Sequence, residues 1–349
     1  MKVAKLLIRY VYFLLRLPIL FVMRLVVPSR GFASTINRIL LIRPDRLGDF
    51  VLSLPVAENL RLHYPEAQID ILVRPALAGL ARMIPAFSNV LISDNSLSAI
   101  AVIRRTPYDL VIDMLCDYTI DSAFLTLVSG AGLRIGFKGW FRELFFSHSI
   151  PASQVAGKHM TDLSLELLKP LGVSAKITIP KISLAKDDPR EMIIGIHPSG
   201  NYPSQRWPKE RFAELAKRML DKYPRATILV FGTPKEKKIV NFVVAQAGGN
   251  RIKAVFPESS ALANLINNCR LLVCNNSGPL HLAQALGVPT VSTMGPTDPV
   301  RWWPKGENSI ILRGTVSCLA CGRGFCWPHR CMDEVGVEDM EKAVESLLK

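Results

Sequence analysis

The chain has 349 residues, enough for about two domains at roughly 150 residues each. Hydrophobic residues make up 49% and charged residues 21%, which excludes a chain that is disordered throughout and excludes collagen-like or low-complexity sequence. The formal net charge of +14 indicates partners that carry phosphate or carboxylate groups, such as nucleic acid, an anionic membrane surface or an acidic substrate.

Half of this charge lies in residues 1–38, which contain seven Lys or Arg residues and no Asp or Glu. On a helix at about 100° per residue, the basic residues from Lys2 to Arg24 fall within an arc of roughly 100°, and the rest of the surface is apolar. A nucleic-acid-binding protein more often places such charge among polar residues of a folded face, so we expect no nucleic-acid partner.

The same N-terminal segment is better suited to lipid. Its longest uncharged run is seven residues, whereas a spanning helix needs about 20 apolar residues. We therefore predict that residues 1–37 form an amphipathic segment that lies on an anionic cytoplasmic leaflet through residues 1–30. A spanning helix and a helix packed on the protein's own core remain alternatives. A cleaved signal peptide is disfavoured because Arg16 and Arg24 interrupt the apolar region.

From residue 38 onward, short β-rich runs alternate with amphipathic helical stretches. This alternation predicts βαβ units, hence an α/β fold with parallel sheets. A polar stretch at 179–190 reads as a linker, which gives domains at 38–180 and 181–349 whose sheets face a shared cleft. The expected strands are 38–43, 68–73, 89–92, 109–114, 134–137, 192–197, 226–231, 271–274 and 289–294, with helices through His63 and near 209–221, 235–246, 260–268 and 279–286.

Open parallel sheets bind ligands beyond the carboxyl ends of their strands, so the loops after these strands are the candidate sites. The loop after the first strand contains Gly48, which permits a tight turn, and then Asp49. A carboxylate that faces the cleft there can accept a proton from a substrate hydroxyl. The alternative is that Asp49 is only a helix N-cap, and Asp45 is a rival carboxylate four residues earlier.

Two further loops have residues suited to a phosphorylated ligand. In the loop at 197–208, Ser199 and Gly200 allow close approach, and Arg206, next to Trp207, can bind phosphate through two hydrogen bonds. The turn after the strand at 226–231 contains Gly232, which permits an approaching nucleotide. Either loop can also be purely structural.

The loop at 275–281 is the strongest anion site. Pro279 suits the first turn of a helix, which would present the amides of Ser277 and Gly278 and the Ser277 hydroxyl at a positive helix end. His281 would lie within that first turn and add a donor to the same anion. A buried packing role is the alternative for this histidine.

Four of the seven cysteines form a C-x2-C-x4-C-x4-C pattern near the end of the chain. They are Cys318, Cys321, Cys326 and Cys331. Zinc needs four converging ligands, but the usual pair of C-x2-C knuckles is incomplete here. We therefore expect reduced thiols in a cytoplasmic loop and no metal site.

Five short motifs occur in a characteristic order. They are Leu47-Gly48-Asp49, His197-Pro198-Ser199-Gly200, Arg206-Trp207-Pro208, Asn276-Ser277-Gly278-Pro279-Leu280-His281 and Gly295-Pro296-Thr297-Asp298-Pro299. Together with the strand that precedes the first motif, they resemble glycosyltransferase family 9, the heptosyltransferase family of lipopolysaccharide core synthesis. The resemblance runs from about residue 38 to the C-terminus and includes the cysteine-containing loop.

The resemblance implies a GT-B architecture, in which the N-terminal Rossmann-like domain takes a lipid-linked saccharide acceptor and the C-terminal one a nucleotide sugar. It implies an inverting, metal-independent transfer, usually from ADP-heptose, with no cofactor, on the cytoplasmic side of the inner membrane. Asp49 matches the family's catalytic carboxylate, the general base that deprotonates the acceptor hydroxyl. The donor-binding residues expected on this basis and from the loops are Ser199, Gly200, Arg206, Trp207, Gly232, Asn276, Ser277, Gly278 and His281.

Two positions depart from the family pattern. Gln205 stands where many members have Lys, and Asn276 stands where many have Asp. The first change removes a cation near the leaving group and the second removes a negative charge. Two alternatives therefore stay open: a related transferase that uses another nucleotide sugar, and a non-catalytic scaffold that binds nucleotide sugar or lipid at the membrane.

Overall fold

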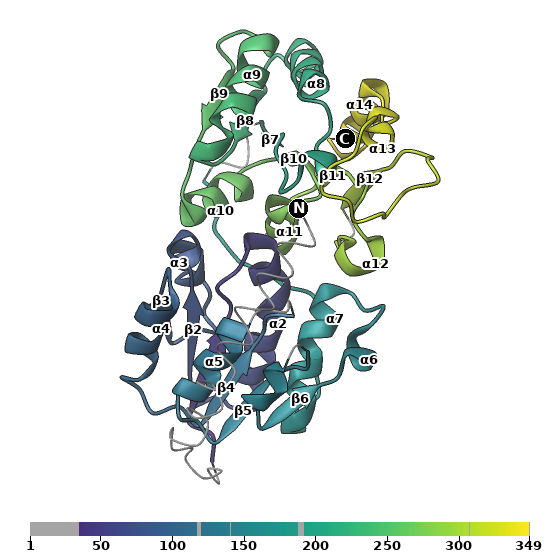
Figure 1. The fold of residues 1–349 in the computed structure, drawn as a ribbon. Helices are drawn as coiled ribbons and strands as arrows, with labels where there is room; N and C mark the ends of the chain where they lie inside the picture. Colours follow the sequence, from purple (N-terminus) through teal and green to yellow (C-terminus); the bar gives the residue numbers. More distant parts are fainter. Residues whose placement is uncertain (1–34, 117–119, 140, 188–191, 307, 349) are drawn as a thin grey trace.

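The computed structural model describes residues 35–116, 120–139, 141–187, 192–306 and 308–348. Within these ranges the chain forms two lobes, each built on one parallel sheet with helices packed on its faces (Figure 1). The expectation of an α/β fold with two parallel sheets is confirmed. The predicted amphipathic segment falls on residues that lie almost entirely outside the described ranges.

The first lobe has six strands in the spatial order β3-β2-β1-β4-β5-β6. Strand β1 is central, and Ile39 to Ile42 are fully buried because helices cover both faces of the sheet. The strands are β1 (Arg38–Ile42), β2 (Gln68–Val73), β3 (Asn89–Ile92), β4 (Leu110–Asp113), β5 (Leu133–Phe137) and β6 (His148–Ile150), and the helices are α2 (Leu47–His63), α3 (Pro75–Ala81), α4 (Ser96–Ile103), α5 (Ile120–Val128), α6 (Ala152–Val155) and α7 (Met160–Leu165).

The second lobe repeats this topology with the order β12-β11-β10-β7-β8-β9. In both sheets the first strand of the lobe is flanked by its second and fourth strands, which is the Rossmann arrangement. The strands are β7 (Ile193–His197), β8 (Thr227–Phe231), β9 (Ile252–Val255), β10 (Leu271–Asn275), β11 (Thr290–Thr293) and β12 (Ser309–Leu312), and the helices are α8 (Lys209–Lys222), α9 (Lys237–Ala247), α10 (Ser259–Asn267), α11 (Gly278–Ala285), α12 (Pro299–Trp302), α13 (Arg330–Asp333) and α14 (Val337–Leu347).

In each sheet the second and third strands are added on one side of the first strand, and the fourth to sixth strands on its other side. The strand order therefore reverses between β1 and β4 in one lobe and between β7 and β10 in the other. Ligands of open α/β sheets bind outside the carboxyl ends of strands at such reversal points. Helix α2 starts at the first of these points and α11 at the second, and the two helices pack against each other. The fold therefore brings the starts of α2 and α11 together between the lobes.

Gly48 and Gly278 make this close packing possible. A Cβ added to Gly278 would lie 3.0 Å from the Leu47 Cβ and 3.1 Å from the Gly48 amide nitrogen. A Cβ added to Gly48 would lie 3.1 Å from a ring carbon of His281. The sequence suggested that a tight turn requires glycine at position 48, but the φ of Gly48 is not positive. Glycine is needed there because a larger side chain would collide with the other lobe.

None of the helices in the described ranges is long and apolar enough to cross a membrane.

Candidate functional site

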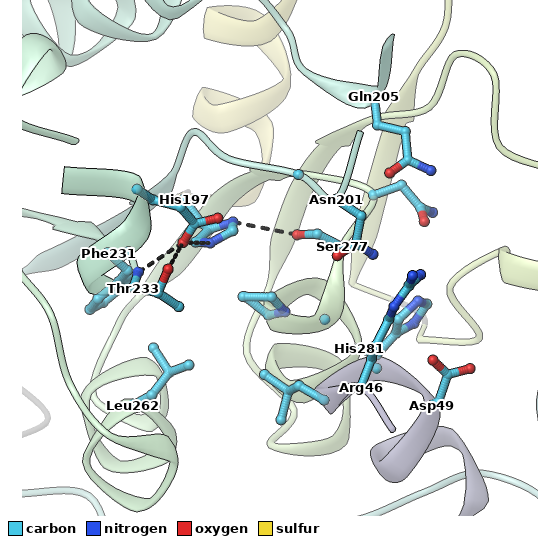
Figure 2. A pocket seen from close by; sticks show the side chains of 18 of the residues that line it. Arg46, Asp49, His197, Asn201, Gln205, Phe231, Thr233, Leu262, Ser277 and His281 are labelled. Atoms are coloured by element: carbon cyan, nitrogen blue, oxygen red, sulfur yellow. Dashed lines mark hydrogen bonds and ion pairs between the residues drawn. The ribbon is translucent and has the colours of Figure 1, made fainter. Parts of the chain in front are cut away.

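A cavity of about 380 Å³ lies between the lobes at the carboxyl ends of both sheets. The first lobe contributes the start of α2, from Arg46 to Asp49, and the second lobe contributes the loops after β7, β8 and β10. Figure 2 shows Asp49, Arg46 and His281 at one end of this cavity and Phe231, Thr233 and Leu262 at the other. The shared cleft expected from the sequence is therefore present.

Asp49 is in the first turn of α2, and the N-cap position belongs to Arg46, so the N-cap alternative for Asp49 is wrong. The Asp49 side chain lies beside the fully buried guanidinium of Arg43, with 3.5 Å between Oδ1 and Nη2. The same guanidinium donates from Nε and Nη2 to the Asp49 carbonyl oxygen, at 3.3 and 3.2 Å. Arg43 thus holds both the backbone and the side chain of Asp49.

Asp45 pairs with the same arginine, its Oδ1 lying 3.2 Å from the Arg43 Nε. Of the two carboxylates, Asp49 is the one that lines the cavity. Burial by itself lowers the pKa of Arg43, but Asp45 and Asp49 outweigh it and hold the pKa above its usual value. The arginine is therefore a permanent cation, and Asp49 is the carboxylate placed to meet a ligand.

The start of α11 presents an anion site to the same cavity. Ser277 is at the N-cap position with extended backbone, and Pro279 is in the first turn. Pro279 has no N–H, and the Leu280 N–H donates to the Ser277 carbonyl at 3.0 Å, so the amides at the helix tip belong to Ser277 and Gly278. Both residues line the cavity, and a helix N-terminus of this kind favours phosphate.

His281 lies in the first turn of α11, is buried, and lines the cavity. Burial, reinforced by the neighbouring His159, lowers the pKa of His281 to about 3. The ring is therefore neutral at physiological pH. It can offer a hydrogen bond to an anion in the cavity but adds no positive charge.

A chain of polar contacts supports the Ser277 hydroxyl. Its Oγ lies 3.4 Å from the His197 Nδ1, and the His197 Nε2 lies 4.0 Å from the Glu236 Oε2 (Figure 2). Glu236 in turn accepts hydrogen bonds from the Thr233 amide and hydroxyl, both at 2.8 Å. Burial lowers the pKa of His197 and the Glu236 carboxylate opposes that shift. These four side chains come from the end of β7 and from the loops after β8 and β10, and they tie the three segments together.

Six of the expected donor-binding residues line the cavity: Gly200, Gly232, Asn276, Ser277, Gly278 and His281. Arg206 lies beside the wall, where its Nε donates to the Gly200 carbonyl at 3.0 Å. The structure does not bring Ser199 to the cavity wall, because this residue is fully buried behind the wall.

Trp207 is a correction to the expected site. Its side chain is fully buried, its indole N–H donates to the Val335 carbonyl at 2.9 Å, and its ring packs edge-on against Phe212 at 4.9 Å between centroids. The wide apolar surface of Trp207 fills the core under α8. It therefore contributes to stability and has no contact with the cavity.

Several residues that line the cavity were not among the site residues expected from the sequence. They include Arg46, His197, Tyr202, Thr233, Glu236 and Leu262. Arg46 lies 6.0 Å from the centre of the Tyr202 ring in the other lobe. A signal existed for Glu236, which forms a capping box with Thr233 at a strand-to-helix turn. The other residues reach the cavity because of the way the two lobes meet, which local sequence patterns do not reveal.

The two residues that depart from the family pattern both make neutral amide hydrogen bonds. The Gln205 Nε2 donates to the Thr297 Oγ1 at 3.2 Å, and the Asn276 Nδ2 donates to the Trp302 carbonyl at 3.2 Å. Both contacts tie cavity loops to the segment around α12. Neither residue supplies charge to the cavity.

The four cysteines of the C-x2-C-x4-C-x4-C pattern are free thiols, from exposed at Cys318 and Cys321 to buried at Cys331. Among the residues that the structure describes, no group of three or more His, Cys, Asp or Glu side chains is arranged to hold a metal ion.

Two polar contacts join the lobes near the cavity. The His159 Nε2 donates to the Trp303 carbonyl at 2.9 Å, and the Lys305 Nζ lies 2.6 Å from the Asp162 Oδ1. Both contacts link α7 and its N-cap to the segment after α12. They join the two lobes beside the end of the cavity where Asp49 and the start of α11 lie.

A family model described as Glycosyltransferase family 9 (heptosyltransferase) matches residues 97–327. Among curated relatives, the chain is 25% identical to lipopolysaccharide heptosyltransferase 3 of Escherichia coli K12, over 86% of this chain and 95% of that protein. It is 26% identical to lipopolysaccharide heptosyltransferase 1 of Pseudomonas aeruginosa, over 83% of this chain and 87% of that protein.

Solved structures show the same fold. The E. coli ADP-heptose lipopolysaccharide heptosyltransferase II superposes with a TM-score of 0.76 at 21% identity, covering 89% of this chain and 98% of that one. An E. coli heptosyltransferase solved with ADP gives a TM-score of 0.73 at 19% identity, covering 89% and 99%. The expected GT-B architecture is confirmed by these likenesses.

Proposed function

The chain belongs to glycosyltransferase family 9 and is a glycosyltransferase, and we propose that it transfers a heptose from ADP-heptose to a lipopolysaccharide-core or glycolipid acceptor. The names of its relatives support this assignment, since they are lipopolysaccharide and lipooligosaccharide heptosyltransferases. In this proposal residues 38–180 bind the acceptor and residues 181–349 bind the donor. The reaction is inverting and needs no metal.

The observation that carries the proposal is the meeting of Asp49, from one lobe, with the start of α11, from the other, in a single cavity. In an inverting transfer the acceptor oxygen attacks the anomeric carbon from the face opposite the departing diphosphate. Such a reaction needs a base on one side of the sugar and an anion site on the other. Both groups line this cavity, Asp49 from the first lobe and the start of α11 from the second.

Asp49 acts as the general base that takes the proton from the acceptor hydroxyl as its oxygen attacks. Its contact with Arg43 keeps the carboxylate aimed from the start of α2. Base catalysis of this kind contributes about 10²–10⁴-fold to the rate.

The donor diphosphate binds at the Ser277 and Gly278 amides, with His281 as an uncharged donor and Arg206 beside the wall. Negative charge grows on the diphosphate as the bond to the sugar breaks. Preorganised donors of this type contribute about 3 kcal/mol each to the transition state. Arg206, the next residue in the sequence after Gln205, takes over the role that Gln205 cannot fill.

The nucleoside occupies the end of the cavity away from Asp49. That end is lined by Phe231, Pro257 and Leu262, which offer apolar surface to a base, and by Thr233 and Glu236, which offer polar atoms. Figure 2 places Phe231 and Leu262 on the side opposite Asp49. This orientation puts the sugar at the end of the cavity that Asp49 and the start of α11 line.

The acceptor is attached to lipid, and the enzyme works at the cytoplasmic side of the inner membrane. The basic and apolar character of residues 1–30 supports a peripheral attachment to anionic lipid.

Purified full-length protein tests the activity directly. It is incubated with a glycolipid acceptor and a panel of ADP-, GDP- and UDP-sugars, with and without EDTA, and the product anomer is assigned by NMR. The proposal expects turnover with ADP-heptose that EDTA does not reduce and a product of inverted configuration. Turnover with a different nucleotide sugar alone would make this a family 9 transferase of another donor class.

A further inference from the structure

The loop between β12 and α13 exposes two large aromatic side chains. Phe325 is 74% exposed and Trp327 is 88% exposed, and only one residue separates them. We call residues 322–330 the aromatic loop; it lies within the segment that projects from the second lobe beside α13 (Figure 1). Single exposed apolar residues are ordinary, but adjacent ones on a projecting loop mark a surface that contacts something apolar.

This loop is anchored at both ends. The Gly322 N–H donates to the Pro296 carbonyl at 2.8 Å, and the Ser204 Oγ donates to the Arg323 carbonyl at 2.5 Å. At the other end the His329 Nε2 donates to the Ser204 carbonyl. The aromatic residues are therefore presented outward by a held backbone.

Within the aromatic loop the charged side chains are basic. Residues 322–330 contain Arg323 and Arg330 and no Asp or Glu, and Asp333 and Glu334 follow at the end of α13. Arg323 and Arg330 are exposed and flank Phe325 and Trp327 in the sequence. Aromatic residues with flanking arginines suit the headgroup region of an anionic membrane, where the rings lie among the apolar parts of the lipid and the guanidinium groups bind phosphate.

The position of the loop relates this surface to the cavity. A Cβ added to Gly324 would lie 3.0 Å from the Tyr202 ring, and Tyr202 lines the cavity opposite Arg46. The aromatic loop therefore adjoins the rim of the cavity on the donor lobe. A lipid surface in contact with the loop would lie close to the opening through which an acceptor reaches Asp49.

We propose that the aromatic loop is a lipid-binding surface, in which Phe325 and Trp327 enter the headgroup region and Arg323 and Arg330 bind the phosphates of anionic lipid. This contact is separate from the one expected of residues 1–30 and comes from the opposite end of the chain. It requires neither ADP-heptose nor a catalytic Asp49.

Tryptophan quenching by brominated lipid tests the proposal in the full-length protein. Vesicles of phosphatidylethanolamine and phosphatidylglycerol carry bromine on their acyl chains, and emission is compared among the wild type, Trp327→Phe and, as a matched control, Trp303→Phe at a partly exposed tryptophan outside the loop. The wild type and Trp303→Phe are expected to be quenched alike, and Trp327→Phe to lose a distinct quenched component. Equal quenching in all three proteins overturns the proposal.

Vesicle affinity provides a second, independent measurement. At about 1 kcal/mol for each basic residue near an anionic surface, Arg323→Gln with Arg330→Gln lowers affinity about 30-fold on anionic vesicles and has little effect on phosphatidylcholine vesicles. A Phe325→Ser and Trp327→Ser double variant lowers affinity about tenfold on the anionic vesicles. Unchanged affinity in both variants contradicts the proposal, as does a change in oligomeric state without a change in vesicle binding.

Transfer assays separate this inference from the proposed function. The Phe325→Ser and Trp327→Ser variant is expected to match the wild type on a delipidated, water-soluble acceptor and to fall several-fold on the same acceptor embedded in vesicles. Absence of any transfer by the wild type would reject the proposed function while leaving the quenching result valid.

Discussion

The guanidinium group of Arg43, fully buried at the end of β1, contacts both the side-chain carboxylate and the main-chain carbonyl of Asp49. It also pairs with Asp45 and donates to the Met114 carbonyl. One buried cation therefore joins the central strand, the start of α2 and the segment after β4. Arg43 therefore contacts Asp49 through both its backbone and its side chain.

Replacement of Arg43 by Met removes the cation that two partly buried carboxylates share. Breaking such a pair costs about 3–5 kcal/mol. We expect the free energy of unfolding, measured with urea, to fall by this amount. Arg43→Lys restores the charge without the planar, multiple hydrogen bonds, so it should regain much of the stability but little of the turnover. Equal recovery of both would show that Arg43 only neutralises charge.

Replacement of Gly278 by Ala pushes the lobes apart. The added Cβ would lie 3.0 Å from the Leu47 Cβ and 3.1 Å from the Gly48 nitrogen, both in the other lobe. A misplacement of up to 1 Å between base and donor can cost about 100-fold in rate, so we expect kcat to fall about 10- to 100-fold. Steady-state kinetics measures this effect.

Gly306→Ala is the matched control for the Gly278 variant. A Cβ at Gly306 would have no neighbour closer than 3.5 Å, which is ordinary contact. Its kinetics should equal those of the wild type. An equal loss in both variants would rule out the contact between α2 and α11 as the cause.

His281 is expected to contribute as a neutral group at every working pH. Since the pKa of His281 lies at about 3, the ring carries no charge above about pH 5. His281→Ala should therefore lower kcat about 10²- to 10³-fold, by the same factor from pH 5.5 to pH 8, as loss of one preorganised donor does. A loss confined to the acid side of the pH–rate profile would mean that a charged imidazolium is the active form.

Glu58 predicts a pH dependence of stability. Burial raises the pKa of the Glu58 carboxyl from 4.5 to about 7, with Lys181 acting in the opposite direction. A carboxyl with a raised pKa in the folded state binds its proton more tightly there than in the unfolded chain. The contribution of the protonated Glu58 carboxyl to the free energy of unfolding is therefore fully present below about pH 4.5 and is lost as pH rises through about 7.

Glu58→Gln removes this dependence. For a half-buried group, the stability that the wild type loses when the carboxyl ionises is about 1 kcal/mol once solvent screening is included. The variant should therefore be more stable than the wild type by that amount at pH 8 and similar to it at pH 4.5. Thermal unfolding at the two pH values measures the difference. A wild type that gains stability between pH 5 and 8 relative to the variant would contradict the assignment.

The periodic segments of this chain were predictable because each obeys a local rule. The buried run at Arg38–Ile42 and the amphipathic helix at Lys209–Lys222 appear where the sequence places them, within one or two residues. The strands Ile252–Val255 and Ser309–Leu312 were missed because they are short and only partly buried, so neither forms a clear apolar run.

The site was predictable where a loop follows a strand directly, and not where its role depends on the other lobe. Pro279 marked the start of α11 correctly because proline suits a first helical turn whatever lies opposite. The need for glycine at position 48, in contrast, arises from contact with Gly278 and His281, which are more than two hundred residues away in sequence. Trp207 was misassigned because a loop tryptophan beside an arginine resembles a ligand contact until its burial is known.

In the proposed reaction Asp49 deprotonates the acceptor hydroxyl in the same cavity that holds the donor diphosphate. Asp49→Asn keeps the shape of the side chain and removes the base, so we expect kcat to fall about 10²- to 10⁴-fold while the Kd for ADP-heptose, measured by calorimetry, stays within about twofold of the wild type. Asp45→Asn, which also borders Arg43 but does not line the cavity, is expected to keep most of the turnover. Unchanged turnover in Asp49→Asn, or a loss of donor binding as large as the loss of turnover, would contradict the account.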